Sequence, residues 1–358
     1  MMARRIAWAA LGACLAAVVL IAPEASGETS SWRATIDPTK EKAPEATQKA
    51  PAAAPKTRKV PLQRATPTEP LKRPLTAPVQ EDDAYALFDQ GRYAAAVKAA
   101  VKAAEKGDAA AHTLIGRVYE EGLGVDRTPE LAAQWYQRAS DLGDQHAQFA
   151  LGLMYAEGRG VNKDLRAAAT QFELAAKQGH AIAQYNIGLI FAHGEGRKED
   201  FAVAAYWFEK SAASGYAPAQ YDLGALYATG TGVPEDLKKA AHWTEKAAVQ
   251  GLAAAQFDFA RMLVFGQGTQ KDEKRAANLI RSAAEKGHPI AQNRLARYLA
   301  WGVVFEPNIA EAAKWHLVAR RAGVSDLRLD DWLSRLTKEE RAEAERAADA
   351  WLEAAKVK

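Results

Sequence analysis

The chain repeats one pattern of small and apolar positions over most of its length. A marker glycine returns every 36 residues, followed after four positions by alanine, after eight by a large apolar residue and after nine by glycine or alanine. Spacings of four place such positions on one helical face. The marker glycines are Gly107, Gly143, Gly179, Gly215, Gly251, Gly287 and Gly323. A constant period of this size, held without an insertion, predicts an array of equivalent helical units.

Each unit is predicted to contain two helices. In five units two further glycines end the first helix, at Gly122/Gly124, Gly158/Gly160, Gly194/Gly196, Gly230/Gly232 and Gly266/Gly268. The second helix is expected to begin after a side chain of N-cap type, at Thr128, Asp164, Asp200, Asp236, Asp272 and Asn308. It carries an Ala-Ala pair in every unit, and in four units a tryptophan for packing. Because neither helix can bury its apolar face alone, the units are expected to stack into a solenoid.

One unit carries a complete motif that resembles a known repeat family. Residues 217–236 read A-x-A-Q-x-x-L-G-x-x-Y-x-x-G-x-G-V-x-x-D, which is similar to the Sel-one-like repeat, a relative of the tetratricopeptide repeat. The resemblance covers residues 108–323, about six copies. It implies an all-α, right-handed α-solenoid whose concave face is lined by the first helix of each unit. Arg197, Thr269 and the run 301–304 depart from the motif, which leaves the geometry of those turns open.

The repeats are flanked by two shorter helical regions. Residues 81–107 are interpreted as a leading hairpin that turns at Gly91. Residues 324–358 are interpreted as capping helices, with Thr337 and Glu340 at the spacing of a capping box.

Residues 1–27 have the pattern of a signal peptide. Arg4 and Arg5 precede an apolar stretch over residues 6–22, and small residues lead up to a cleavage site after Gly27. We therefore expect a periplasmic or secreted protein. An alternative is retention in the inner membrane, with residues 6–22 as the anchor.

Residues 28–80 differ sharply from the repeats in composition. They contain nine prolines, and ten basic residues against five acidic ones. Such a segment cannot bury enough apolar surface to fold, so we expect a disordered tether. Its excess of five positive charges permits weak contact with a membrane surface or the cell wall.

Composition narrows the chemistry. The 358 residues are 48% hydrophobic with only 8% aromatic residues, which favours close-packed helices. The net charge of +3 is too small to indicate nucleic-acid binding. No H-E-x-x-H, G-x-S-x-G or paired histidine motif occurs, and the single cysteine, Cys14, lies within the signal pattern. We therefore expect no catalytic residues, metal or cofactor.

The sequence-based candidate site is the face of the first helices opposite the alanine and glycine columns. Its expected partner-binding residues are Phe149, Tyr185, Tyr221, Phe257, Leu153, Leu189, Arg261 and Arg297. Aromatic and arginine side chains suit an acidic, partly apolar segment of another protein. The hypothesis is a non-enzymatic scaffold or regulator in the cell envelope, and a cell-wall-associated enzyme or accessory is the alternative. The aromatic column is equally consistent with packing between units.

Overall fold

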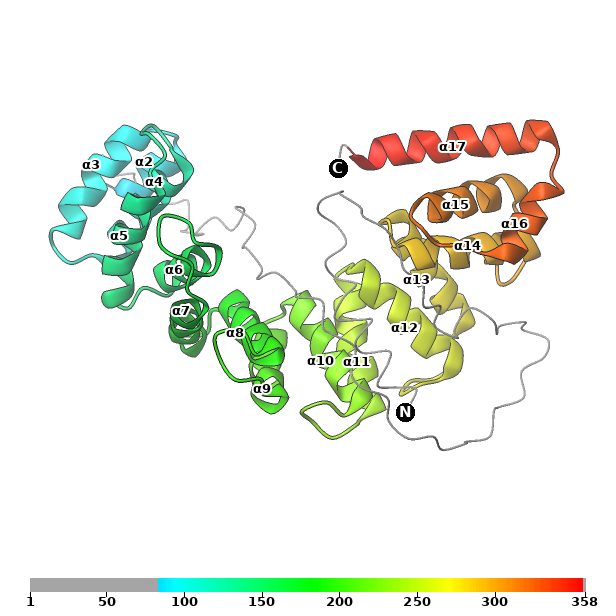
Figure 1. The fold of residues 1–358 in the computed structure, drawn as a ribbon, viewed down its shortest axis with the longest axis horizontal. Coiled ribbons are helices and arrows are strands. Elements are labelled where there is room, and N and C mark those ends of the chain that lie inside the picture. The colour runs from blue at the N-terminus through cyan, green and yellow to red at the C-terminus, as the bar shows by residue number, and fades with distance from the viewer. Residues whose placement is uncertain (1–82, 357–358) are drawn as a thin grey trace.

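The computed structural model describes residues 83–356, and every regular element in this range is an α-helix. The proposed signal peptide and tether lie outside the described residues. Figure 1 shows the helices following one another in a curved array. Their bounds are α2 (Ala84–Asp89), α3 (Tyr93–Ala104), α4 (Ala109–Glu121), α5 (Pro129–Asp141), α6 (Gln145–Glu157), α7 (Leu165–Lys177), α8 (Ala181–His193), α9 (Phe201–Ala213), α10 (Ala217–Thr229), α11 (Leu237–Val249), α12 (Ala253–Phe265), α13 (Glu273–Glu285), α14 (Pro289–Trp301), α15 (Ile309–Arg321), α16 (Leu327–Ser334) and α17 (Lys338–Lys356).

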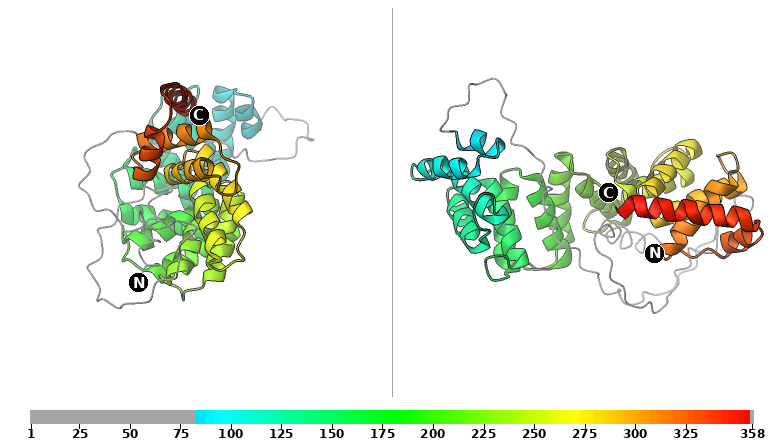
Figure 2. Two further views of the ribbon diagram at one scale, coloured as in Figure 1. Left: turned by 90° about the vertical axis from the view of Figure 1, so that its right-hand side faces the viewer. Right: turned by 90° about the horizontal axis from the view of Figure 1, so that it is seen from above.

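The twelve helices from α4 to α15 form six two-helix units. Each has 13 residues and packs mainly against the helices before and after it in the chain. The first helices of the units are α4, α6, α8, α10, α12 and α14, and the second helices are α5, α7, α9, α11, α13 and α15. Two further views show this stacking from the side and from above (Figure 2). The predicted all-α solenoid of six 36-residue units is confirmed.

Local side chains set where the helices begin and end. All five glycines predicted to end a first helix, Gly122 among them, adopt left-handed C-cap conformations with φ between 64° and 75°. Five of the six predicted N-cap side chains accept a backbone N–H of the second helix. Thr128 does not, because its hydroxyl donates to the Asp126 carbonyl oxygen at 3.1 Å instead.

In five units a glutamine follows the alanine that stands four positions after the marker glycine, and this glutamine joins consecutive units. Its side chain is buried, and its Nε2 donates to the carbonyl oxygen eight residues earlier, near the end of the preceding second helix. The donor–acceptor distance is 3.0 Å for Gln184 and 3.1 Å for Gln220. Each of these carbonyl oxygens also accepts the N–H of the marker glycine that follows it, so the glutamine adds a second hydrogen bond at the end of the helix.

In five of the six units the glycine or alanine of the first helix matches the size of the side chain that faces it. A Cβ added to Gly188 would lie 2.6 Å from ring carbons of Phe208, so only glycine fits there. Gly152 meets Phe172 in the same way. Where the first helix carries alanine instead, at Ala260 and Ala296, the residue twenty positions later is Ile280 or His316 rather than Phe or Tyr. In these units the size of one residue compensates for the size of the other. Gly224 is the exception, because the residue that faces it is the small Thr244.

The last turn between the paired helices keeps the glycine geometry without the glycine. Val304 stands where the other units have glycine and adopts φ = 66°, the one non-glycine residue with positive φ among residues 83–356. At the equivalent Gly268, an added Cβ would lie only 1.8 Å from the Leu237 carbonyl oxygen. The departure noted over residues 301–304 therefore leaves the turn intact but places a β-branched residue in a strained conformation.

The C-terminal helices complete the core. Leu329, Leu333, Ala344 and Ala348 are buried against the last units. Before α17, the Thr337 N–H donates to Glu340 Oε2 at 2.8 Å and the Glu340 N–H donates to Thr337 Oγ1 at 3.2 Å, which confirms the capping box. No helix between residues 83 and 356 is long and apolar enough to cross a membrane.

Candidate binding surface on the first helices

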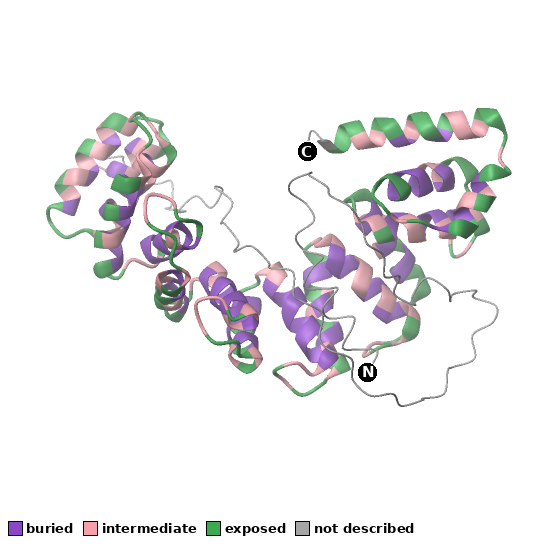
Figure 3. Ribbon diagram, viewed as in Figure 1, coloured by how far each residue is buried: buried purple, intermediate pink, exposed green. Residues whose placement is uncertain are grey.

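The side chains in the middle of the predicted binding face, on α8 and α10, are not accessible to a partner. Every residue of α8 and α10 is buried or half-buried (Figure 3). The rings of Tyr185 and Tyr221 are only 1% and 2% exposed. Phe149, Leu153 and Leu189 are buried as well. The expectation that these five side chains offer an open apolar surface is therefore wrong.

The tyrosines are buried because they connect consecutive first helices. The Tyr185 hydroxyl donates to Asp222 Oδ2, 37 residues later, at 2.7 Å. The Tyr221 hydroxyl donates to Asp258 Oδ2 with the same separation and the same distance. A tyrosine that donates to the next unit cannot also turn toward a partner. The aromatic column therefore packs units together, at least at these two positions.

The two phenylalanines of the same column stack on histidines of the next unit. The centroids of Phe149 and His180 lie 4.5 Å apart, and those of Phe257 and His288 lie 4.8 Å apart, with both ring pairs inclined by 22°. Of the four aromatic residues, only Phe257 is half-buried rather than buried, so it keeps part of its ring accessible.

Both stacked histidines are also helix N-caps. His180 Nδ1 accepts the Ala183 N–H at 3.1 Å, and His288 Nδ1 accepts the Ala291 N–H at 3.2 Å. Burial, helped by nearby His146, lowers the pKa of His180 to about 4. Burial also lowers the pKa of His288. These rings are neutral packing groups, and within the described part of the chain no cluster of three His, Cys, Asp or Glu side chains could hold a metal ion.

A buried carboxylate lies at the centre of the array. Asp222 is 2% exposed, and burial raises its pKa to about 7 although the hydrogen bond from Tyr185 acts in the opposite direction. Its second oxygen, Oδ1, has no hydrogen-bond partner among the residues that the structure describes. The group is thus held in the core by a single donor.

The two arginines of the predicted site are already paired. Arg261 Nη2 lies 3.4 Å from Asp258 Oδ1, and Arg297 Nε lies 2.6 Å from Asp326 Oδ2. Asp326 also accepts the Asn293 side-chain amide at 3.1 Å and caps α16. Burial alone would raise the pKa of Asp326, but the hydrogen bond and charge of Arg297 lower it. The expectation that Arg261 and Arg297 are free to bind carboxylates is wrong in this structure.

Arg294, which the sequence-based site omitted, is the unpaired cation of this region. It is half-buried on α14, and no carboxylate or aromatic ring between residues 83 and 356 pairs with its guanidinium. Burial and the like charge of Arg297 lower its pKa, whereas Tyr298 and the negative charge of Asp326 act in the opposite direction. It stands seven positions after Gly287. The sequence-based face is built from the residues three, six, ten and fourteen positions after each marker glycine. At about 100° per residue, position seven is within about 40° of positions three and fourteen. Including position seven would have found it.

Large exposed apolar residues on the first helices are confined to α12 and α14. They are Phe265, Ile290 and Trp301, with exposures of 40%, 53% and 45%. The other exposed large apolar residues of the described chain lie on second helices, in turns or in α16. We define the α14 face as Ile290, Arg294, Arg297 and Trp301. The Arg297 guanidinium lies 6.0 Å from the centre of the Trp301 ring, so these side chains are neighbours.

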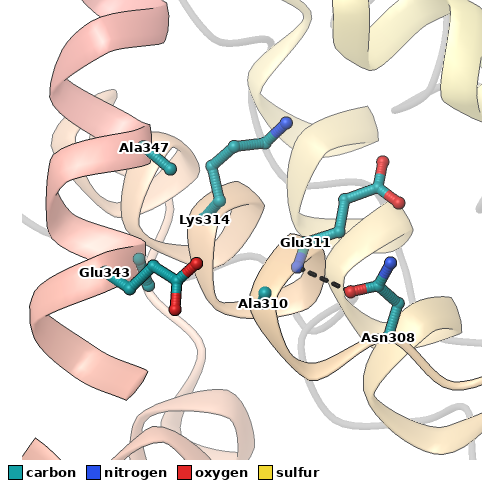
Figure 4. A pocket seen from close by; sticks show the side chains of 7 residues that line it. Asn308, Ala310, Glu311, Lys314, Glu343 and Ala347 are labelled. Carbon is teal, nitrogen blue, oxygen red and sulfur yellow. Dashed lines mark hydrogen bonds between the residues drawn. The ribbon is translucent and has the colours of Figure 1, made fainter. Parts of the chain in front are cut away.

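A separate cleft of about 260 Å³ lies between α15 and α17. Figure 4 shows Asn308, Glu311, Lys314 and Glu343 around it, with the Asn308 side chain accepting the Glu311 N–H. Glu311 Oε1 already accepts hydrogen bonds from Arg281 and from Trp315. The lining contains no histidine, cysteine, serine or threonine. Its one lysine, Lys314, lies with Nζ 4.2 Å from the centre of the Trp315 ring.

Comparison with known proteins agrees with the repeat architecture. The Sel1 repeat matches residues 109–144, 145–180, 181–216, 217–252, 253–288 and 289–324. The crystal structure of a Sel1 repeat protein from Oxalobacter formigenes is 29% identical, with a TM-score of 0.59, and the match covers 67% of this chain and 97% of that one. A protective antigen of uropathogenic Escherichia coli that displays an SLR fold is 30% identical, with a TM-score of 0.52, and the match covers 73% of this chain and 64% of that one. No curated protein matches the sequence. With six consecutive matched repeats and the corresponding helices in place, the chain belongs to the Sel1 repeat family.

Proposed function

We propose that this protein is a non-enzymatic scaffold or regulator of the bacterial cell envelope that holds a segment of a partner protein on its first helices. Sel1 repeat proteins generally mediate protein–protein interactions, and their scaffold is typically non-catalytic. The signal-peptide pattern of residues 1–27 supports export, with anchoring by residues 6–22 as the alternative topology.

The location of the exposed apolar residues carries the proposal. On the first helices they gather on α12 and α14, where Phe265, Ile290 and Trp301 are each at least 40% exposed. Half-buried Phe257 belongs to the same two helices. Exposed aromatic side chains beside arginine are typical of protein-binding hot spots. We therefore place the docking region on the later units, α12 and α14, and not on the tyrosines of α8 and α10.

The charge of this region favours an acidic, partly apolar partner segment. Asp258 and Asp326 form ion pairs with Arg261 and Arg297, which leaves Arg294 without an ion pair of its own among the described residues. The basic segment 28–80 does not complement that charge, so we propose another protein as the occupant.

The test is capture of envelope proteins by the full chain. Wild type is expected to retain one stoichiometric protein partner. Ile290→Ser combined with Trp301→Ala should weaken its binding about tenfold or more, because both apolar contacts are removed. The matched control is Tyr206→Ala with Ile309→Ser, which removes similarly exposed residues from second helices.

Two outcomes would contradict the proposal. Equal retention of the partner by wild type and the α14 variant would exclude the α14 face as the docking site. Sedimentation of the wild-type protein with purified cell wall, with no protein partner captured, would favour the cell-wall-associated alternative.

A further inference from the structure

We infer that Arg294 binds a carboxylate of the partner. The α14 face then recognises a partner segment in which one acidic residue lies between two apolar residues. This inference rests on the proposed function and specifies the ligand chemistry of the same surface. It assigns the main electrostatic contact to Arg294, a residue that the sequence-based candidate site did not include.

Within the part of the chain that the structure describes, Arg294 is the one arginine of this region without an ion pair, so it can bind one additional anion. Arg297 is held by Asp326 at 2.6 Å, and Arg261 by Asp258 at 3.4 Å. Asp326 is itself only 3% exposed on its side chain and accepts two further backbone N–H groups of α16, so it has little capacity for Arg294. A half-buried guanidinium without a carboxylate bears a desolvation cost that an incoming carboxylate offsets.

The surroundings favour a carboxylate over a phosphate. Only one positive charge in this cluster is uncompensated, and the carboxylates of Asp258 and Asp326 would repel a dianion. The planar guanidinium matches a carboxylate with two parallel hydrogen bonds. Partial burial strengthens such a pair compared with one in open solvent.

The spacing along α14 predicts the spacing in the ligand. Helical residues rise about 1.5 Å each, so Arg294 lies about 6 Å along the axis from Ile290 and about 10 Å from Trp301. An extended chain advances about 3.3 Å per residue. Alternate side chains of an extended chain point to the same face, so only even spacings place all three ligand side chains toward α14. The matching ligand therefore carries apolar residues two positions from its acidic residue on one side and four positions on the other.

The probe is a pair of synthetic peptides measured by fluorescence anisotropy with the full chain. One has the sequence acetyl-Ala-Leu-Ala-Glu-Ala-Ala-Ala-Trp-Ala-amide with an attached fluorophore, and the other has Gln in place of Glu. Wild type is expected to bind the Glu peptide about tenfold more tightly than the Gln peptide, because only the former supplies a charged acceptor.

Variants at Arg294 separate this anchor from general charge. Arg294→Gln should remove the preference for Glu while leaving binding of the Gln peptide within about twofold. Arg294→Lys should keep part of the preference, since the charge remains but the paired donors do not. Arg346→Gln, at an exposed position on α17, makes the same charge change away from the face and should leave the preference intact. Thermal unfolding of each variant checks that the fold persists.

The inference is overturned if wild type binds both peptides equally or neither at millimolar concentration. It is also overturned if Arg294→Gln keeps the preference for Glu. The proposed function fails separately, if the Ile290 and Trp301 variant retains the captured envelope protein as well as wild type does. If a captured envelope protein is released by the Ile290 and Trp301 variant but not by Arg294→Gln, docking on α14 stands and the carboxylate anchor does not.

Discussion

The hydroxyl of Tyr185 donates a 2.7 Å hydrogen bond to the carboxylate of Asp222 in the next unit. The ring and the carboxylate are both at most 2% exposed, and the other carboxylate oxygen, Asp222 Oδ1, has no hydrogen-bond partner among the described residues. The bond therefore supports a buried acid as well as joining two helices.

Removing the Tyr185 hydroxyl should destabilise the solenoid. Tyr185→Phe keeps the ring but leaves Asp222 without its donor, so we expect the free energy of unfolding to fall by about 2 kcal/mol. Chemical denaturation followed by circular dichroism measures this. Tyr221→Phe is the matched control: it should cost less, because Asp258 is more exposed and also contacts Arg261. Equal losses for the two variants would contradict the account.

The stability contributed at His180 should depend on pH. Its pKa falls from 6.5 in the unfolded chain to about 4 in the fold. Between these values the unfolded state binds the extra proton, so the free energy of unfolding decreases as the pH falls from 6.5 to 4, by on the order of 3 kcal/mol. His180→Asn retains an N-cap side chain and should remove this dependence.

Buried Asp222 acts in the opposite direction over an overlapping range. Its raised pKa, about 7 against an ordinary 3.8, makes its contribution greatest at low pH and lost as the pH rises through 7. The His180 effect is therefore measured as the difference between wild type and His180→Asn at each pH. A constant difference from pH 7 to pH 4 would show that His180 does not titrate as described.

The fit between Gly188 and Phe208 should be reversible in a double variant. Gly188→Ala places a Cβ 2.6 Å from the ring and should lower the free energy of unfolding by about 2 kcal/mol. Adding Phe208→Ile recreates the Ala260 and Ile280 pair of a later unit and should recover part of that loss. If the double variant is as unstable as the sum of the two single ones, the two positions do not compensate each other.

Replacing Val304 with glycine should stabilise the last unit. Val304 holds φ = 66°, which costs a β-branched residue more than glycine, so Val304→Gly is expected to raise the free energy of unfolding by about 1 kcal/mol. Thermal melting compares it with Val303→Gly. That neighbouring residue has no positive φ, and its replacement should destabilise the protein through lost packing and added chain entropy.

The helices were predictable because their determinants are local. Glycine at Gly122 supplies the left-handed conformation that ends α4, and Asp164 caps α7 within its own sequence neighbourhood. The predicted surface failed where burial depends on the next unit. Nothing local to Tyr185 indicates that an acceptor lies 37 residues later, and Arg297 is neutralised by a carboxylate beyond the last repeat.

The link from Tyr185 to Asp222 also implies that the units are not interchangeable modules. Excision of residues 217–252 would bring Tyr185 next to Asp258, and a hydroxyl would again face a carboxylate. Excision of residues 181–216 would instead bring Phe149 next to Asp222, which would leave a buried acid facing a ring with no donor. Loss of residues 217–252 should therefore be tolerated better than loss of residues 181–216, although both segments are 36 residues long.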